Sequence, residues 1–217
     1  MILGIDTSTS VCSVALWDGE KFIEWEDKNP TGHSSILMPL VKKAMDFAGG
    51  NVDTLVVSRG PGSFTGVRIG VSTALGLQFS EKLNVYSVSS LQARSYLDGF
   101  DGIRLPIIDA RRERVYGACY GAMEYEEINA PFVHFLDLLK DTNEPVALLG
   151  ESIEHFYDMA TKALTQEVTL VETRAMAKGA IRAYLEGKFS TDLHPVYLRE
   201  VEAVRRRKEK EDADSGD

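Results

Sequence analysis

Two successive parts of this chain carry the same order of strand-like and helix-like segments. The Asp18-Gly19 dipeptide, which is typical of a tight hairpin turn, lies between two alternating strand-like runs in the first part. The segments of this part are strands at 1–8 and on the two sides of that turn, a helix at 34–48, a strand at 53–60, a helix at 65–83, a strand at 84–90 and a short helix at 89–97.

From Gly102 onward the order returns, with three strands followed by alternating helices and strands. The predicted strands cover 103–110, 114–120, a weaker segment near Met123, 145–150 and 167–172, and the predicted helices cover 132–140, 152–164 and 173–188. A duplicated βββαβα unit predicts a two-domain α/β protein that resembles the actin, hexokinase and Hsp70 superfamily (the ASKHA fold). We expect one subdomain at 1–101 and a second at 102–200, followed by a charged, disordered tail at 201–217.

The composition limits the classes of partner and the location. The chain has 217 residues and a formal net charge of −9, which argues against a broad electrostatic surface for nucleic acid or anionic membranes. No apolar run approaches the roughly 18 residues of a membrane-spanning helix, and residues 1–10 lack the basic start of a signal peptide. Cys12 and Cys119 show no CxxC spacing, so we expect two buried free thiols in a cytoplasmic protein.

Five motifs together resemble one protein family, and they follow its order along the chain. They are ILGIDTST at 2–9, HSSILMP at 33–39, GPGSFTGVRIG at 60–70, DARRERVYGACY at 109–120 and PVYLR at 195–199. On these motifs the sequence resembles the TsaB (YeaZ) family of bacterial tRNA threonylcarbamoyladenosine biosynthesis proteins.

The resemblance implies a non-catalytic subunit that has no cofactor of its own. Its partner would be a homologous TsaD-like catalytic subunit, which carries the ATP and the metal and transfers a threonylcarbamoyl group to the tRNA adenosine beside the anticodon. A small TsaE-like ATPase would assist. The resemblance also leads us to expect a homodimer when the partner is absent, a contact with tRNA that is indirect or weak, and no membrane contact.

The turn after the first strand is where nucleotide-binding members of the superfamily carry Asp-x-Gly. Glycine lets the backbone amides approach the phosphates, but Ser8 stands in its place here, and Arg111 does so in the second half. The hydroxyl groups of this turn can still donate to a phosphate, or they satisfy the backbone of the turn itself. We predict no catalytic residue and at most a weak nucleotide or phosphate contact, at Asp6, Thr7, Ser8 and Thr9.

A metal centre is not expected. No two of the four histidines, which are His33, His134, His155 and His194, have the i, i+4 spacing of a helical metal site. TsaD-like relatives carry His-x-x-x-His after the strand that follows their glycine-rich helix, where this sequence has Ser90 and Arg94. Because a guanidinium stays protonated, it does not serve as a metal ligand.

The glycine-rich segment 59–70 (RGPGSFTGVRIG) has neither the spacing nor the lysine of a phosphate-binding P-loop. Gly62 directly precedes Ser63, so the G-x-S-x-G pattern of a nucleophilic serine is absent too. We expect Ser63 or Thr65 to cap the helix that follows.

Two helices are predicted to bind the partner subunit or a second copy of this chain. Small residues recur at four-residue spacing on the helix at 65–83, which flattens its surface for close packing against another helix or within this chain. The helix at 34–48 carries more apolar residues than one face can bury, among them adaptable methionines. The predicted interface residues are Leu37, Met38, Val41, Met45, Gly66, Gly70 and Ala74. A bulky charged residue at Gly70 or Ala74 should then abolish the complex and leave the chain folded.

Arg111, Arg112 and Arg114 form a basic turn, which either contacts an anion or RNA phosphate or is simply solvated. Two other functions stay open at this point. One is an ATP-dependent small-molecule kinase of the ASKHA fold, with Asp6 as its catalytic or magnesium-orienting carboxylate. The other is a homodimeric binding module.

Overall fold

The computed structural model describes residues 1–27, 32–173 and 176–198. The first half of the chain forms β1 (Ile2–Asp6), β2 (Cys12–Trp17), β3 (Phe22–Asp27), α1 (His33–Ala48), β4 (Thr54–Ser58), α2 (Phe64–Glu81), β5 (Asn84–Val88) and α3 (Ser90–Arg94). The second half forms β6 (Ile103–Arg111), β7 (Arg114–Gly121), β8 (Tyr125–Pro131), α4 (Phe132–Leu139), β9 (Val146–Gly150), α5 (Glu154–Ala163), β10 (Val168–Glu172) and α6 (Ala177–Leu185). The strand predicted near Met123 begins two residues later, at Tyr125.

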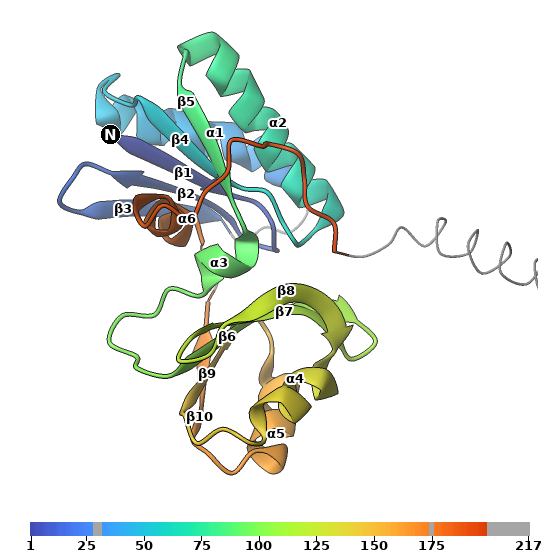
Figure 1. The fold of residues 1–217 in the computed structure, drawn as a ribbon. Helices are drawn as coiled ribbons and strands as arrows, with labels where there is room; N and C mark the ends of the chain where they lie inside the picture. Colours follow the sequence, from blue (N-terminus) through green and yellow to red (C-terminus); the bar gives the residue numbers. More distant parts are fainter. Residues whose placement is uncertain (28–31, 174–175, 199–217) are drawn as a thin grey trace, which may run out of the picture.

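Each half contributes one five-stranded mixed sheet, and the two sheets have equivalent strand orders (Figure 1). The first runs β3-β2-β1-β4-β5, and the second, counted the same way, runs β8-β7-β6-β9-β10. In both, an antiparallel three-stranded meander is extended by two parallel strands. The duplicated βββαβα plan predicted from the sequence is therefore confirmed.

The hairpin between β2 and β3 is closed by its own turn residues, as the sequence predicts. The Asp18 carboxylate accepts hydrogen bonds from the backbone amides of Glu20 and Lys21, both at 2.9 Å. Such a local side-chain bond holds the turn without help from the rest of the protein.

Both faces of the first sheet are covered. On one face, α1 and α2 bury the larger core, which includes Leu3, Ile5 and Leu55. On the other face lies α6, whose residues Ala177 and Ile181 pack against Ala15 of β2. The second sheet buries Phe132 and Phe135 of α4 and Phe156 of α5 on one of its faces.

The last helix of each half packs on the sheet of the other half. The short helix α3 lies between the sheets (Figure 1) and contacts β6 and β7, while α6 packs on β1, β2 and β4. The two helices cross at Gly179, where a Cβ atom would lie 2.0 Å from the carbonyl oxygen of Ala93. The predicted division assigned α6 to the subdomain at 102–200 and left open that a late helix packs back on the first domain; the structure places α6 on the first sheet. The predicted tail at 201–217 lies outside the described residues.

Cys12 and Cys119 are buried free thiols, as predicted. Burial raises the pKa of each thiol to about 12, so neither is a ready nucleophile at neutral pH. None of the helices in the described part of the chain is long and apolar enough to cross a membrane.

Candidate functional site

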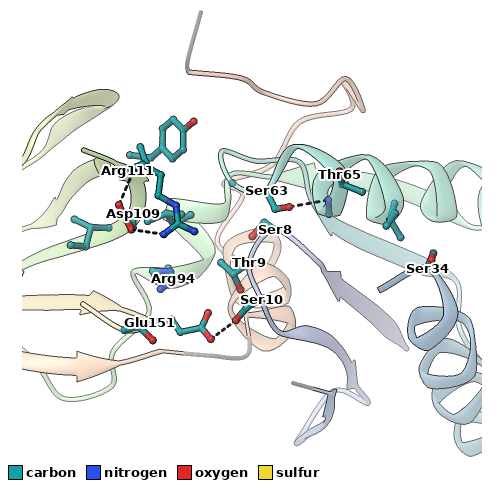
Figure 2. A pocket seen from close by; sticks show the side chains of 18 residues that line it. Ser8, Thr9, Ser10, Ser34, Ser63, Thr65, Arg94, Asp109, Arg111 and Glu151 are labelled. Atoms are coloured by element: carbon teal, nitrogen blue, oxygen red, sulfur yellow. Dashed lines mark hydrogen bonds and ion pairs between the residues drawn. The ribbon is translucent and has the colours of Figure 1, made fainter. Parts of the chain in front are cut away.

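A cavity of about 640 Å³ opens between the two sheets. Figure 2 shows that its walls come from the turn after β1, the glycine-rich loop before α2, the end of β6 and the segment after β9. Hydroxyl groups and four charged side chains line it, namely Arg94, Asp109, Arg111 and Glu151. This cavity brings together residues from both halves of the chain that are far apart in the sequence.

The turn after β1 is held by hydrogen bonds within the chain. Asp6 is buried, and its carboxylate accepts bonds from the backbone amide of Ser8 at 3.0 Å and from the Ser8 hydroxyl at 3.1 Å. Burial raises the pKa of the Asp6 carboxyl group. The Thr7 hydroxyl donates to the carbonyl oxygen of Gly66 at 2.7 Å. Of the four residues predicted to contact phosphate, only Ser8 and Thr9 line the cavity.

The end of β6 repeats this arrangement in the second half. The Asp109 carboxylate accepts a 2.7 Å hydrogen bond from the amide of Arg111, two residues later, as Asp6 does from Ser8. Arg111 lies at the cavity and pairs with Asp109, with 3.6 Å between Nη1 and Oδ2. Arg112 is exposed, whereas Arg114 binds Asn129 through Nε at 2.9 Å and Nη2 at 2.6 Å. The predicted basic cluster is therefore split, and only Arg111 faces the cavity.

The β6–β7 hairpin turns through three residues with positive φ: 71° at Arg111, 56° at Arg112 and 57° at Glu113. Each non-glycine residue in this region costs roughly 1 kcal/mol. We expect Glu113→Gly to raise the free energy of unfolding by about 0.5–1 kcal/mol, because glycine adopts this conformation freely. Urea denaturation measures the change. The matched control is Glu126→Gly, on the exposed side of β8, which should instead lower stability; equal effects of the two changes would contradict the expectation.

The glycine-rich loop uses its amides to bind the protein itself. The amide of Gly60 donates to the Ser90 hydroxyl at 3.2 Å, and the amide of Ser63 donates to the carbonyl oxygen of Ser8 at 2.7 Å. Ser63 caps α2 as predicted, since its hydroxyl accepts a bond from the amide of Gly66 at 3.2 Å. The loop therefore joins α2 to the β1 turn.

Comparisons with known proteins agree with this geometry. The family model of TsaD, tRNA N6-adenosine threonylcarbamoyltransferase, matches residues 29–182. The tRNA threonylcarbamoyladenosine biosynthesis protein TsaB of Bacillus subtilis (strain 168) is 34% identical over 93% of this chain and 95% of its own length. The chain belongs to the TsaB family. TsaB of Escherichia coli (strain K12) is 31% identical over 91% of this chain and 94% of its own length.

Solved structures give the same family and fold. YeaZ from Pseudomonas aeruginosa has a TM-score of 0.72 and 28% identity, covering 91% of this chain and 99% of that one. The ROK hexokinase from Thermus thermophilus, at 12% identity and a TM-score of 0.51 over 86% of this chain and 99% of its own, shows likeness of fold alone. The ASKHA architecture predicted from the repeated elements is thus confirmed.

Three of the residues predicted to bind a partner are covered by this chain itself, namely Gly66, Gly70 and Ala74. Gly66 and Gly70 face the β1 turn, where a Cβ would lie 2.0 Å from the carbonyl oxygen of Thr7 and 2.5 Å from its hydroxyl oxygen, respectively. Ala74 is fully buried. The close approach inferred from this spacing is therefore made by the chain's own turn. A bulky charged residue at Gly70 or Ala74 is expected to unfold the protein, which corrects the sequence-based expectation.

Of the remaining predicted interface residues, some are buried within the chain and one is exposed. Leu37 and Val41 are buried under the first sheet, and Met45 is half-buried against the same core. Met38 is 49% exposed on α1, and on α2 the exposed apolar side chains are Phe64 at 50%, Leu75 at 46% and Phe79 at 91%. Sequence spacing alone did not separate the covered stripe of each helix from its open one.

Several cavity residues, among them Arg94, Asp109 and Glu151, were not singled out as ligand-binding groups from the sequence. Arg94 was considered only as a replacement for a metal-binding histidine, yet it is one of the largest fully buried side chains in the described structure. Its burial results from the packing of α3 against α6, β6 and β7, which the sequence alone does not show. Within the described ranges, no three His, Cys, Asp or Glu side chains gather into a group that could hold a metal ion.

Proposed function

We propose that this chain is a non-catalytic subunit of the cytoplasmic machinery that forms threonylcarbamoyladenosine in tRNA, and that it acts by binding a TsaD-like catalytic subunit. The observation that carries the proposal is the identity to a TsaB protein across nearly the whole chain. The exposed apolar side chains on α1 and α2 support it, because Met38, Leu75 and Phe79 offer a surface for a second protein.

The two aspartate turns support a role without nucleotide hydrolysis by this chain. A phosphate site at such a turn needs free backbone amides, but the amides of Ser8 and Arg111 both donate to an aspartate of their own turn. ATP and metal would then be carried by the catalytic partner. The kinase alternative needs Asp6 to reach a substrate or a magnesium ion, and Asp6 is buried and does not line the cavity.

Mixing the purified chain with the TsaD-like protein of the same organism tests the proposal. The expected result is a common, earlier elution position in size-exclusion chromatography, and faster threonylcarbamoyl transfer to tRNA by the partner when the chain is present. A TsaE-like ATPase should join this assembly, and without the partner the chain should self-associate.

The chain alone is expected to show no ATP turnover above background. Turnover by the chain alone would favour the kinase. Unchanged elution of both proteins, with a persistent dimer of this chain, would favour the homodimeric binding module.

A further inference from the structure

Arg94 ends the short helix α3 at the inner side of the cavity between the sheets. Its side chain is 2% exposed, and it lines the cavity together with residues of both halves. Figure 2 shows it among Thr9, Glu151 and the Asp109–Arg111 turn. In the structure its Nε and Nη2 atoms have no hydrogen-bond partner.

A buried cation with two unpaired nitrogens is costly, because these atoms have lost their water without replacing it. Burial lowers the pKa of Arg94 to about 10, and the nearby Asp6 and Glu151 carboxylates work in the opposite direction. The guanidinium is therefore positively charged at neutral pH. An anion that supplied the missing acceptors would relieve the cost of burying this charge.

The geometry of the unpaired atoms indicates which kind of anion fits. Nε and Nη2 lie along one edge of the planar guanidinium, which is the edge that binds two oxygens of a phosphate or carboxylate side by side. The Thr9 hydroxyl oxygen is also buried without a partner, and it belongs to the same cavity. Both arginine nitrogens are themselves shielded, so the guanidinium must turn toward the cavity when an ion binds.

The carboxylates that face the cavity are already engaged. Glu151 accepts a hydrogen bond from the Ser10 hydroxyl, and Asp109 pairs with Arg111 (Figure 2). These contacts reduce the repulsion that either carboxylate would exert on an incoming anion. Arg111 in addition places a second positive charge at the cavity.

We propose that the cavity binds a small molecule through an oxyanion group, a phosphate or a carboxylate, held by Arg94 with help from Thr9. The volume of about 640 Å³ leaves room for the rest of such a molecule beyond the ion itself. Met38, Leu75 and Phe79, which form the proposed partner-binding surface, do not line the cavity, so this site goes beyond the proposed function.

Thermal unfolding of the full chain tests the site. The wild-type protein is titrated with inorganic phosphate and, separately, with acetate, against potassium chloride at the same ionic strength. At ten times the dissociation constant of the ion that binds, we expect Tm to rise by about 3–5 °C, with saturation. The arm that responds identifies the oxyanion as phosphate or carboxylate, and either response supports the proposal.

Two substitutions connect the response to Arg94. Arg94→Met removes the cation and should abolish the rise in Tm. Arg94→Lys keeps the charge but loses the two-pronged edge, and it should bind at least about 10-fold more weakly. If Arg94→Met does not fold, two measurements still test the proposal. One is the response of the lysine variant, and the other is the nuclear magnetic resonance signal of the wild-type Arg94 Nε–H, which should shift on titration. The control is Arg112→Met, an exposed arginine of the neighbouring turn, which should respond like wild type.

Three outcomes would overturn the proposal. One is a wild-type Tm that responds to phosphate and acetate no more than to chloride. The second is an equal rise in the Arg94 variants, which would place the ion elsewhere. The third is an Arg94 Nε–H signal that stays unchanged while Tm rises.

Discussion

Gly66→Ala is expected to lower the free energy of unfolding by about 3 kcal/mol. The added Cβ would lie 2.0 Å from the carbonyl oxygen of Thr7, which belongs to the backbone of the buried β1 turn. Relief requires α2 or the turn to move, and the 2.7 Å hydrogen bond from the Thr7 hydroxyl to Gly66 would be strained with it. Urea denaturation should show a lower midpoint with an unchanged slope.

The control for this substitution lies on the same helix. Gly76 is exposed, and a Cβ added there would meet no atom within 4 Å. Gly76→Ala should therefore raise the stability of the isolated chain by about 0.5–1 kcal/mol through helix propensity alone. If Gly66→Ala changed the stability as Gly76→Ala does, this would contradict the close packing of α2 on the β1 turn.

Phe79→Glu is expected to weaken binding of the TsaD-like subunit by at least about 100-fold, because exposed aromatic anchors dominate the energetics of interfaces. Phe79 is 91% exposed and lies one helical turn from Leu75, which is 46% exposed. The charge would be buried without a partner in the complex. Since Phe79 makes few contacts in the free chain, its stability should change by less than about 0.5 kcal/mol. Isothermal titration calorimetry gives the affinity.

Val133 provides the matched control for the interface. It is 52% exposed on α4, in the second half of the chain, so Val133→Glu adds the same charge at a similarly open apolar position. We expect partner binding to be unaffected by it. Equal loss of affinity in both variants, or full affinity in Phe79→Glu, would place the interface elsewhere.

The elements and their repetition could be predicted from local signals. The hairpin at Asp18-Gly19 closes through the side chain of Asp18, and Ser63 caps α2 next to its own position in sequence. Such features depend on residues a few positions apart. The family resemblance was also readable, because its motifs lie in short, ordered segments.

It was harder to predict which face of each helix is buried and which segment covers it. On α2 the four-residue spacing of Gly66, Gly70 and Ala74 correctly indicated close packing, but it did not identify what packs there. The β1 turn fills that surface, while Leu75 and Phe79 stay open. A spacing pattern describes the shape of a surface and carries no information about which segment covers it.

The caps and turns of this chain follow from its local sequence, since their hydrogen bonds join neighbouring residues. The order of strands and helices follows from the hydrophobic periodicity of each segment. The contact of α3 with the second sheet and the packing of α6 on the first sheet do not follow from the local sequence. They depend on packing between segments more than 80 residues apart, such as Ala93 and Gly179. The burial of Arg94 arises from that packing as well, since α3 lies between both sheets. In the sequence Arg94 looks like any other arginine. Its guanidinium is proposed as an anion-binding group only because the fold removes the water around it.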